Sequence, residues 1–178
     1  MSKQRVLLFI PIVLFAVLGL LFFRGLSIDP SEMPSALLNK PLPKFSLPRL
    51  ENSQELHTQT HEQGKVTLLN FWATTCITCR EEHAFLNQLK GQGVHIVGVD
   101  YEDNSVDALR WIATLGNPYD DIIVDGEGRL GLDLGVFGLP ETYVIDKQGV
   151  IRYKHIGDLN QKVWSETIQP LIASLEQK

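Results

Sequence analysis

Residues 66–83 read VTLLNFWATTCITCREEH, and the pattern of the chain changes within this short stretch. The first seven residues form a mostly apolar run, which is typical of a strand buried on both faces of a sheet. From Cys76 to Lys90 the apolar residues recur at helical spacing, so a helix is predicted there. Cys76 and Cys79 therefore lie at a predicted strand-to-helix junction.

A Cys-x-x-Cys pair at the start of a helix has a specific chemical consequence. Unpaired backbone N–H groups and the positive end of the helix dipole favour a thiolate at the first cysteine, so Cys76 is the expected nucleophile. Cys79 lies three residues on, on the same helix face, and can attack a mixed disulfide on Cys76 to release the partner. The pattern predicts thiol–disulfide exchange.

A zinc site and a purely structural disulfide are both less favoured for this cysteine pair. Zinc normally takes four protein ligands, and the sequence has neither a second Cys-x-x-Cys nor a His-x-x-x-His pair to complete such a site. A structural disulfide would close a very short loop, which constrains the unfolded chain little. We therefore expect no metal and no other cofactor.

After this junction the chain alternates short apolar runs with amphipathic stretches, which is the pattern of an α/β domain. A helix is predicted over 105–115, capped by Ser105 or Asn104, and a terminal helix from about Gln161. Strands are predicted at 95–99 and 122–124, and a hairpin at 142–145 and 150–153. The strand at 66–72, the helix after it and the strand at 95–99 make a βαβ unit.

The N-terminal part of the chain has a different composition. Residues 6–23 carry no charged side chain, and a helix over them, at about 1.5 Å per residue, would be roughly 27 Å long. Lys3 and Arg5 precede the stretch, and cationic flanks favour the cytoplasmic side. We expect a cytoplasmic tail at 1–5, an uncleaved transmembrane anchor at 6–23, a linker at 24–36 and one domain at 37–178.

The remainder of the chain is acidic. The formal net charge is −5, and setting aside Lys3, Arg5 and Arg24 leaves 13 basic and 21 acidic residues, a net charge of −8. Nucleic acid is disfavoured as a partner of so acidic a domain.

The sequence also resembles a known family. Residues 69–83 resemble the active-site segment of thioredoxin-like proteins. GVFGLPETY at 135–143 and IRYKHIGDLN at 151–160 are similar to segments of the cytochrome c maturation thiol:disulfide oxidoreductases, called CcmG or DsbE. The resemblance covers about residues 37–178. It implies a thioredoxin-like α/β fold with a central mixed β-sheet flanked by helices, preceded by one N-terminal transmembrane helix.

The same resemblance implies a function. A single-pass protein of the bacterial inner membrane would face the periplasm, be kept reduced by a membrane thiol:disulfide electron donor, and reduce disulfides so that haem can attach. Its client would be apocytochrome c or the maturation partner that holds the apocytochrome thiols. Two alternatives stay open. One is a general periplasmic thiol reductase or oxidase; the other is a Cu(I)-binding chaperone using the cysteines and His83 or His155.

Motif matching also implies roles for single residues. Pro140 would be a cis-proline facing the disulfide, and Pro140 and Glu141 would bind the substrate peptide. Glu82 and Glu141 would be acids near the cysteines. The sequence would be the same if Pro140 were only a turn proline and if Glu82 and Glu141 were solvated surface acids. Glu82 is favoured as the proton partner of Cys79, because Asn70 occupies the strand position where thioredoxins carry a buried aspartate.

Trp72 matches an aromatic residue packed behind the site, as any core tryptophan would. The chain departs from the family at Thr75 and Ile77, where Trp-Cys-Pro-Thr-Cys is usual. Without proline the first helical turn loses a fixed φ angle and gains an N–H, which changes how a Cys76 thiolate is held. A shift of about 30 mV in the reduction potential corresponds to roughly 1.4 kcal/mol, so a modest local change is enough to move the protein between a reductant and a near-neutral exchanger. The sequence therefore leaves the direction of electron flow open.

Overall fold

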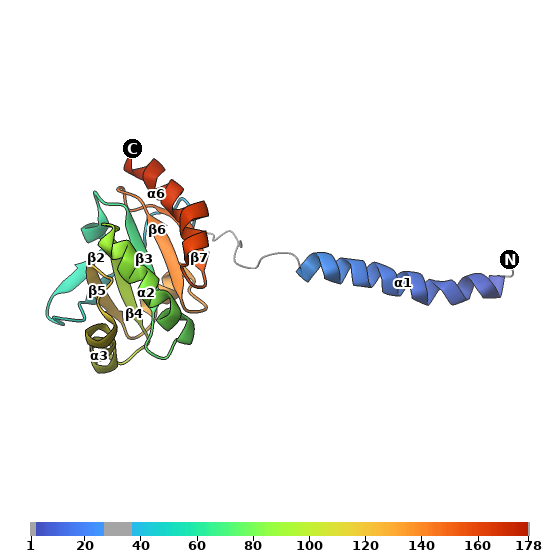
Figure 1. Ribbon diagram of the computed structural model, residues 1–178, viewed down its shortest axis with the longest axis horizontal. Coiled ribbons are helices and arrows are strands. Elements are labelled where there is room, and N and C mark those ends of the chain that lie inside the picture. Colours follow the sequence, from blue (N-terminus) through green and yellow to red (C-terminus); the bar gives the residue numbers. More distant parts are fainter. Residues whose placement is uncertain (1–2, 27–36, 178) are drawn as a thin grey trace. The chain divides into compact units, whose positions relative to one another are not determined.

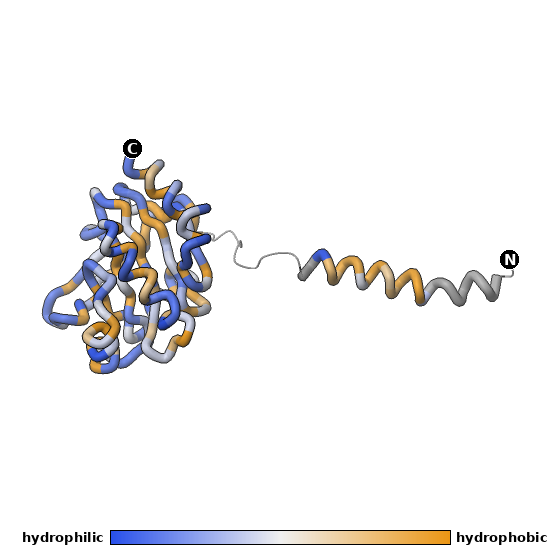
Figure 2. Tube along the Cα trace, viewed as in Figure 1, coloured by the Kyte–Doolittle hydropathy of each residue, from blue (hydrophilic) through white to orange (hydrophobic). Residues whose placement is uncertain are grey.

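The computed structural model describes residues 3–26 and 37–177 of the chain. The chain divides into two units, the N-terminal helix α1 (Lys3–Leu26) and an α/β domain. Large apolar side chains of α1 between Ile12 and Phe23 are exposed, and this part of the helix is hydrophobic along its length (Figure 2). In the part of the chain whose side chains are described, which for α1 is residues 11–24, no helix has an apolar span long enough to cross a membrane. The first two residues of the expected tail and residues 27–36 of the expected linker lie outside the described residues.

A mixed sheet of five strands forms the centre of the domain (Figure 1). Its order is β5-β4-β3-β6-β7, with β3, β4 and β5 parallel and with β6 antiparallel to both β3 and β7. The strands are β3 (Thr67–Trp72), β4 (Ile96–Tyr101), β5 (Asp121–Asp125), β6 (Glu141–Ile145) and β7 (Ile151–Ile156). All five predicted strands are confirmed, with small shifts at their ends.

Strand β3 is buried at every position because both faces of the sheet are covered. One face packs against α2 (Ile77–Gly91), α3 (Ser105–Leu115) and the C-terminal helical segment. That segment consists of α5 (Gln161–Val163), the π-helical turn η3 (Trp164–Ile168) and α6 (Gln169–Glu176). The other face packs against α4 (Arg129–Leu134) and the chain at 37–47. Two apolar cores thus hold β3 and the residues that follow it.

The predicted helices are also present, and their ends have clear causes. Asn104 rather than Ser105 caps α3, because its side-chain oxygen accepts hydrogen bonds from the backbone N–H groups of Val106 and Asp107. The turn between β6 and β7 is closed by the Asp146 carboxylate, which accepts from two backbone N–H groups. Gly149 in this turn has a φ of +77°, which glycine adopts readily.

Four short elements were not predicted from the sequence: β1 (Ser46–Pro48), β2 (Leu56–Thr58), the 3-10 helix η2 (Gln59–Glu62) and α4. They are too short to show a periodic pattern, and tertiary contacts hold them. His57 of β2 is the clearest case. Its two ring nitrogens lie 2.6 Å from a Glu62 oxygen and 2.5 Å from an Asp121 oxygen, which ties the β1–β2 hairpin to strand β5.

Candidate active site

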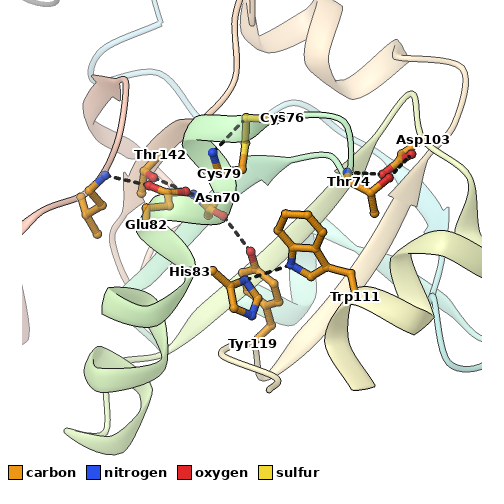
Figure 3. The surroundings of a disulfide bond; sticks show 11 residues. Asn70, Thr74, Cys76, Cys79, Glu82, His83, Asp103, Trp111, Tyr119 and Thr142 are labelled. Carbon is orange, nitrogen blue, oxygen red and sulfur yellow. Dashed lines mark hydrogen bonds between the residues drawn. A yellow bond between two sulfur atoms is a disulfide. The ribbon is translucent and has the colours of Figure 1, made fainter. Parts of the chain in front are cut away.

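Cys76 and Cys79 form a disulfide at the N-terminus of α2, directly after the loop that leaves β3 (Figure 3). Cys76 is the N-cap of the helix, and its sulfur accepts a hydrogen bond from the Cys79 backbone N–H at 3.0 Å. Cys79 is only 3% exposed, whereas Cys76 is half-buried. Another protein's sulfur can therefore reach Cys76 more easily, and the helix N-terminus stabilises a thiolate there once the disulfide is reduced.

Asp103 holds the loop that leads into Cys76. Its carboxylate accepts one hydrogen bond from the backbone N–H of Thr74 and another, 2.9 Å long, from the Thr74 hydroxyl. Asp103 follows β4, the parallel neighbour of β3, so these hydrogen bonds join the loops that leave the two strands (Figure 3). No sequence pattern indicates this pair, because 29 residues separate the two positions.

Glu82 lies one helical turn after Cys79 and is 3% exposed. One carboxylate oxygen accepts a hydrogen bond from the Asn70 side-chain amide at 3.0 Å, and the other accepts from the Leu159 backbone N–H at 2.7 Å. Burial raises the pKa of Glu82 to about 7 against the opposing effect of these hydrogen bonds, and the negative charge of Asp158 adds to the rise. A carboxyl group with such a pKa can take up or release a proton near neutral pH.

Asn70 connects Glu82 to the rest of the core. Its amide group also donates to the Thr142 hydroxyl at 3.0 Å, and its side-chain oxygen accepts from the Tyr119 hydroxyl at 3.0 Å (Figure 3). The Tyr119 hydroxyl therefore orients the amide so that its NH₂ group faces Glu82. Sequence reasoning missed Tyr119 because it lies 49 residues away, in a loop with no recognisable motif.

His83 and Trp72 support the site from behind. The Trp111 indole N–H donates to Nδ1 of His83 at 3.2 Å, and Nε2 of His83 donates to the Gly116 carbonyl at 2.9 Å. Both ring nitrogens of His83 are thus engaged, and burial lowers its pKa. Trp72 is 1% exposed and stacks on Tyr119 with 5.7 Å between ring centroids. In this arrangement His83 has no free nitrogen for a copper ion.

Pro140 and Glu141 lie at the start of β6, which pairs with β3 on the side opposite to β4. The peptide bond between Leu139 and Pro140 is cis, as the resemblance implies. Because Glu141 pairs with Phe71 in the sheet register, Pro140 is placed beside the end of β3 that leads to the cysteines. The side chains of Asn70 and Trp72 thus face α2, which carries Glu82, and Pro140 directly precedes β6 at the same end of the sheet as the cysteines.

The Glu141 side chain faces the opposite core and has partners of its own. It is fully buried and contacts Lys154 Nζ at 2.9 Å, the Tyr143 hydroxyl at 3.0 Å and the Phe137 backbone N–H at 3.2 Å. Through Phe137 it holds the loop that precedes Pro140. Across the residues described, no group of three or more His, Cys, Asp or Glu side chains is arranged to hold a metal ion.

Comparisons with known proteins agree with this geometry. The Redoxin family model matches residues 37–168. The chain is 47% identical to the thiol:disulfide interchange protein DsbE of Pseudomonas aeruginosa over 172 residues, which cover 97% of this chain and 96% of the relative. It is 49% identical to DsbE of Escherichia coli K12 over 175 residues, 95% of this chain and 94% of the relative.

Solved structures show the same fold. A secreted thiol-disulfide isomerase from Corynebacterium glutamicum superposes with a TM-score of 0.68 at 20% identity, covering 82% of this chain and 96% of that one. A thiol-disulfide oxidoreductase from Bacteroides fragilis gives a TM-score of 0.63 at 21% identity, covering 74% and 99%. The domain therefore has a thioredoxin-like fold with a central mixed sheet and flanking helices.

Proposed function

Because the chain belongs to the DsbE family of thiol:disulfide interchange proteins, we propose that it reduces the disulfide of apocytochrome c, or of the maturation partner that holds the apocytochrome thiols. The protein is a thiol:disulfide oxidoreductase. The observation that carries the proposal is the difference between the two cysteines. Cys76 is accessible at a helix N-terminus, while Cys79 is buried one turn from Glu82, and these are the surroundings that a nucleophile and a resolving thiol need.

The exchange runs in two steps. In the dithiol form, the Cys76 thiolate attacks one sulfur of the client disulfide, a mixed disulfide forms, and the other client sulfur leaves as a thiolate that takes up a proton. Glu82 then removes the proton from Cys79, which attacks the Cys76 sulfur. The second client sulfur leaves as a thiolate, the client is reduced by two electrons, and Cys76 and Cys79 are oxidised to the disulfide. A membrane thiol:disulfide electron donor would restore the dithiol form.

We assign client binding to the end of the central strands β3 and β6, beside the cysteines. Pro140 lies there, next to the end of β3, and an extended client segment can pair with the neighbouring backbone. Glu141 acts on this binding site indirectly, because its carboxylate accepts a hydrogen bond from the Phe137 N–H in the loop before Pro140. Phe137 itself is 68% exposed and offers an apolar contact to a client.

We also propose that residues 6–23 anchor the protein in the bacterial inner membrane as a single span. Residues 1–5 would be a cytoplasmic tail, 24–36 a linker and 37–178 the periplasmic domain. The apolar, uncharged composition of 6–23 and the positions of Lys3 and Arg5 support this arrangement. Extraction of membranes at alkaline pH tests it: the full chain should stay with the membranes and residues 37–178 alone should not.

Trapping of the mixed disulfide tests the exchange itself. Cys79→Ser should accumulate a covalent complex with a haem-binding Cys-x-x-Cys-His peptide supplied as its disulfide, because the resolving thiol is missing. Cys76→Ser is the matched control and should form none, since the accessible nucleophile is lost. Equal trapping by both variants, or by neither, would contradict these roles.

A deletion strain separates the proposed client from a general one. Loss of covalent haem in c-type cytochromes, restored by the wild type and not by Cys76→Ser, is the expected result. Normal cytochromes together with altered disulfide content in other periplasmic proteins would favour the general thiol reductase or oxidase.

A further inference from the structure

Asp100 is a buried acid that the exchange mechanism above does not use. It lies on β4, is 0% exposed, and neither oxygen of its carboxyl group has a hydrogen-bond partner within the described part of the chain. The indole N–H of Trp72 is also buried and unpartnered. Buried polar atoms are nearly always paired, and an ionised carboxylate without a partner in an apolar core is very costly. A neutral carboxyl group at this position costs far less than a charged one.

The position of Asp100 places it behind the disulfide loop. Trp72 and Asp100 are register partners on β3 and β4, so their side chains lie next to each other on the face that carries α2. Gly98, two residues before Asp100 on the same face, leaves the space for two rings: a Cβ there would lie 2.9 Å from the Trp72 indole nitrogen and 2.9 Å from Cγ of Tyr119. The carboxyl group thus adjoins the aromatic cluster that supports the cysteines.

The charged surroundings of Asp100 favour its neutral form. Burial is the main cause that raises the pKa of Asp100 to about 7, and the negative charge of Asp103 raises it further. Burial raises the pKa of Tyr119, and the charges of Glu82 and Asp100 raise it further, so the tyrosine lies within the field of each acid. Among the described residues, Asp103 and Tyr119 act electrostatically on or with Asp100. Glu82, His83 and Arg80 lie around the aromatic cluster, and Cys76 and Cys79 pack in the same core as Trp72. Of these, Arg80 lies over the outer aromatic residue Trp111 and leaves the Asp100 oxygens unpaired.

We propose that Asp100 is a second proton-holding acid behind the active site, neutral while Cys76 carries a thiolate and ionising more readily once the Cys76–Cys79 disulfide has formed. Asp100 does not touch either sulfur and acts only through its charge. A thiolate at Cys76 disfavours a second negative charge nearby, and by the same coupling an ionised Asp100 disfavours the thiolate. Above neutral pH, Asp100 therefore makes the dithiol form harder to reach and the protein a stronger reductant. This inference depends on the thiol:disulfide chemistry and not on which client the protein reduces.

Aspartate-selective carboxyl ¹³C labelling tests the proposal on the wild-type chain, since Glu82 is then silent in the spectrum. One aspartate carboxyl should titrate at least about two pH units above the remaining aspartates, and its midpoint should be higher in the dithiol form than in the disulfide form. If every aspartate titrates in the ordinary range, or if that one midpoint is the same in both forms, the proposal is wrong. No variant has to fold for this measurement.

Asp100→Asn tests the effect on the cysteines, with Asp133→Asn, at an exposed position of α4, as the matched control. The equilibrium constant for reduction of the protein by glutathione should rise about threefold or more in Asp100→Asn at a pH well above 7, and stay within about twofold of wild type well below 7. The control should match wild type at both. A change of equal size at low and high pH would mean that the substitution acts through packing, and would overturn the charge-based role.

Discussion

The side-chain amide of Asn70 donates a hydrogen bond to the Glu82 carboxyl group, 3.0 Å away, in the core directly behind the disulfide. Burial favours the neutral acid and raises the pKa of Glu82 to about 7, while the hydrogen bonds from the Leu159 backbone and from Asn70 favour the ionised carboxylate and limit the rise. Tyr119 keeps the amide in the donating orientation. The pair thus sets a proton-transfer group near neutral pH without an aspartate on β3.

Glu82→Gln should slow the release of client from the mixed disulfide by about tenfold to a hundredfold, because no general base then takes the Cys79 proton. The inflection of the rate near pH 7 should disappear with it. Stopped-flow measurement of exchange with a disulfide peptide, over a pH series, reports both quantities. Glu81→Gln is the control, since its side chain is exposed on the same helix, and it should behave as wild type. An unchanged pH profile in Glu82→Gln would rule out the proton-transfer role.

The stability of the disulfide form should fall as pH rises from about 4.5 to about 7, because of Glu82. The pKa of Glu82 is raised in the folded protein, so between these pH values the unfolded chain has lost the proton while the folded protein keeps it. The free energy of unfolding therefore falls as pH rises. The contribution is on the order of 3 kcal/mol, lost as pH passes through the folded pKa. Urea unfolding at several pH values, compared with Glu82→Gln, isolates it. The difference between the two proteins should grow with pH; a constant difference would contradict the raised pKa.

Local sequence patterns predicted the elements that carry the chemistry. The run at 66–72 became the fully buried strand β3, and the cysteine pair lies at the start of α2 as predicted. Both inferences rest on residues that are close in the sequence. A strand buried on both faces gives a continuous apolar run, and the start of a helix favours a thiolate at the first cysteine. The structure adds the hydrogen bond between Asn70 and Glu82, which was not predicted from the sequence.

Long-range contacts could not be predicted in the same way. Tyr119 reaches Asn70 from 49 residues away, and Asp103 reaches Thr74 from 29 residues away, so no spacing in the sequence encodes either pair. Asp100 looks like an ordinary acid after an apolar strand until β4 is seen to be buried at that position. The fully buried side chain of Glu141 faces the core opposite to α2, because side chains alternate between the two faces along β6.

Gly98→Ala should destabilise the domain by about 1–3 kcal/mol, because a methyl group there meets Trp72 and Tyr119 at distances shorter than van der Waals contact. The displaced Tyr119 should also lose its hold on Asn70. Urea unfolding measures the first effect, and the pH midpoint of exchange measures the second. Gly91→Ala makes the same change at the end of α2, where nothing lies within 4 Å, and should be neutral or stabilising by up to about 1 kcal/mol. Equal stability of the two variants would show that the rings can move aside.

Lys154→Met should lower the free energy of unfolding by about 3 kcal/mol, because it leaves the carboxylate of Glu141 buried without its cation. Methionine is a similarly long side chain without the charge, so the loss reports the ion pair together with the cation–π contacts of Lys154 Nζ over the Phe137 and Tyr143 rings. The double variant Lys154→Met with Glu141→Gln should recover much of the stability, since the buried charge is gone. Urea unfolding of the wild type, both single variants and the double variant completes the cycle. If the two substitutions were simply additive, the Lys154–Glu141 ion pair would add nothing to stability, and the hydrogen bonds from Tyr143 and Phe137 would suffice for the buried carboxylate.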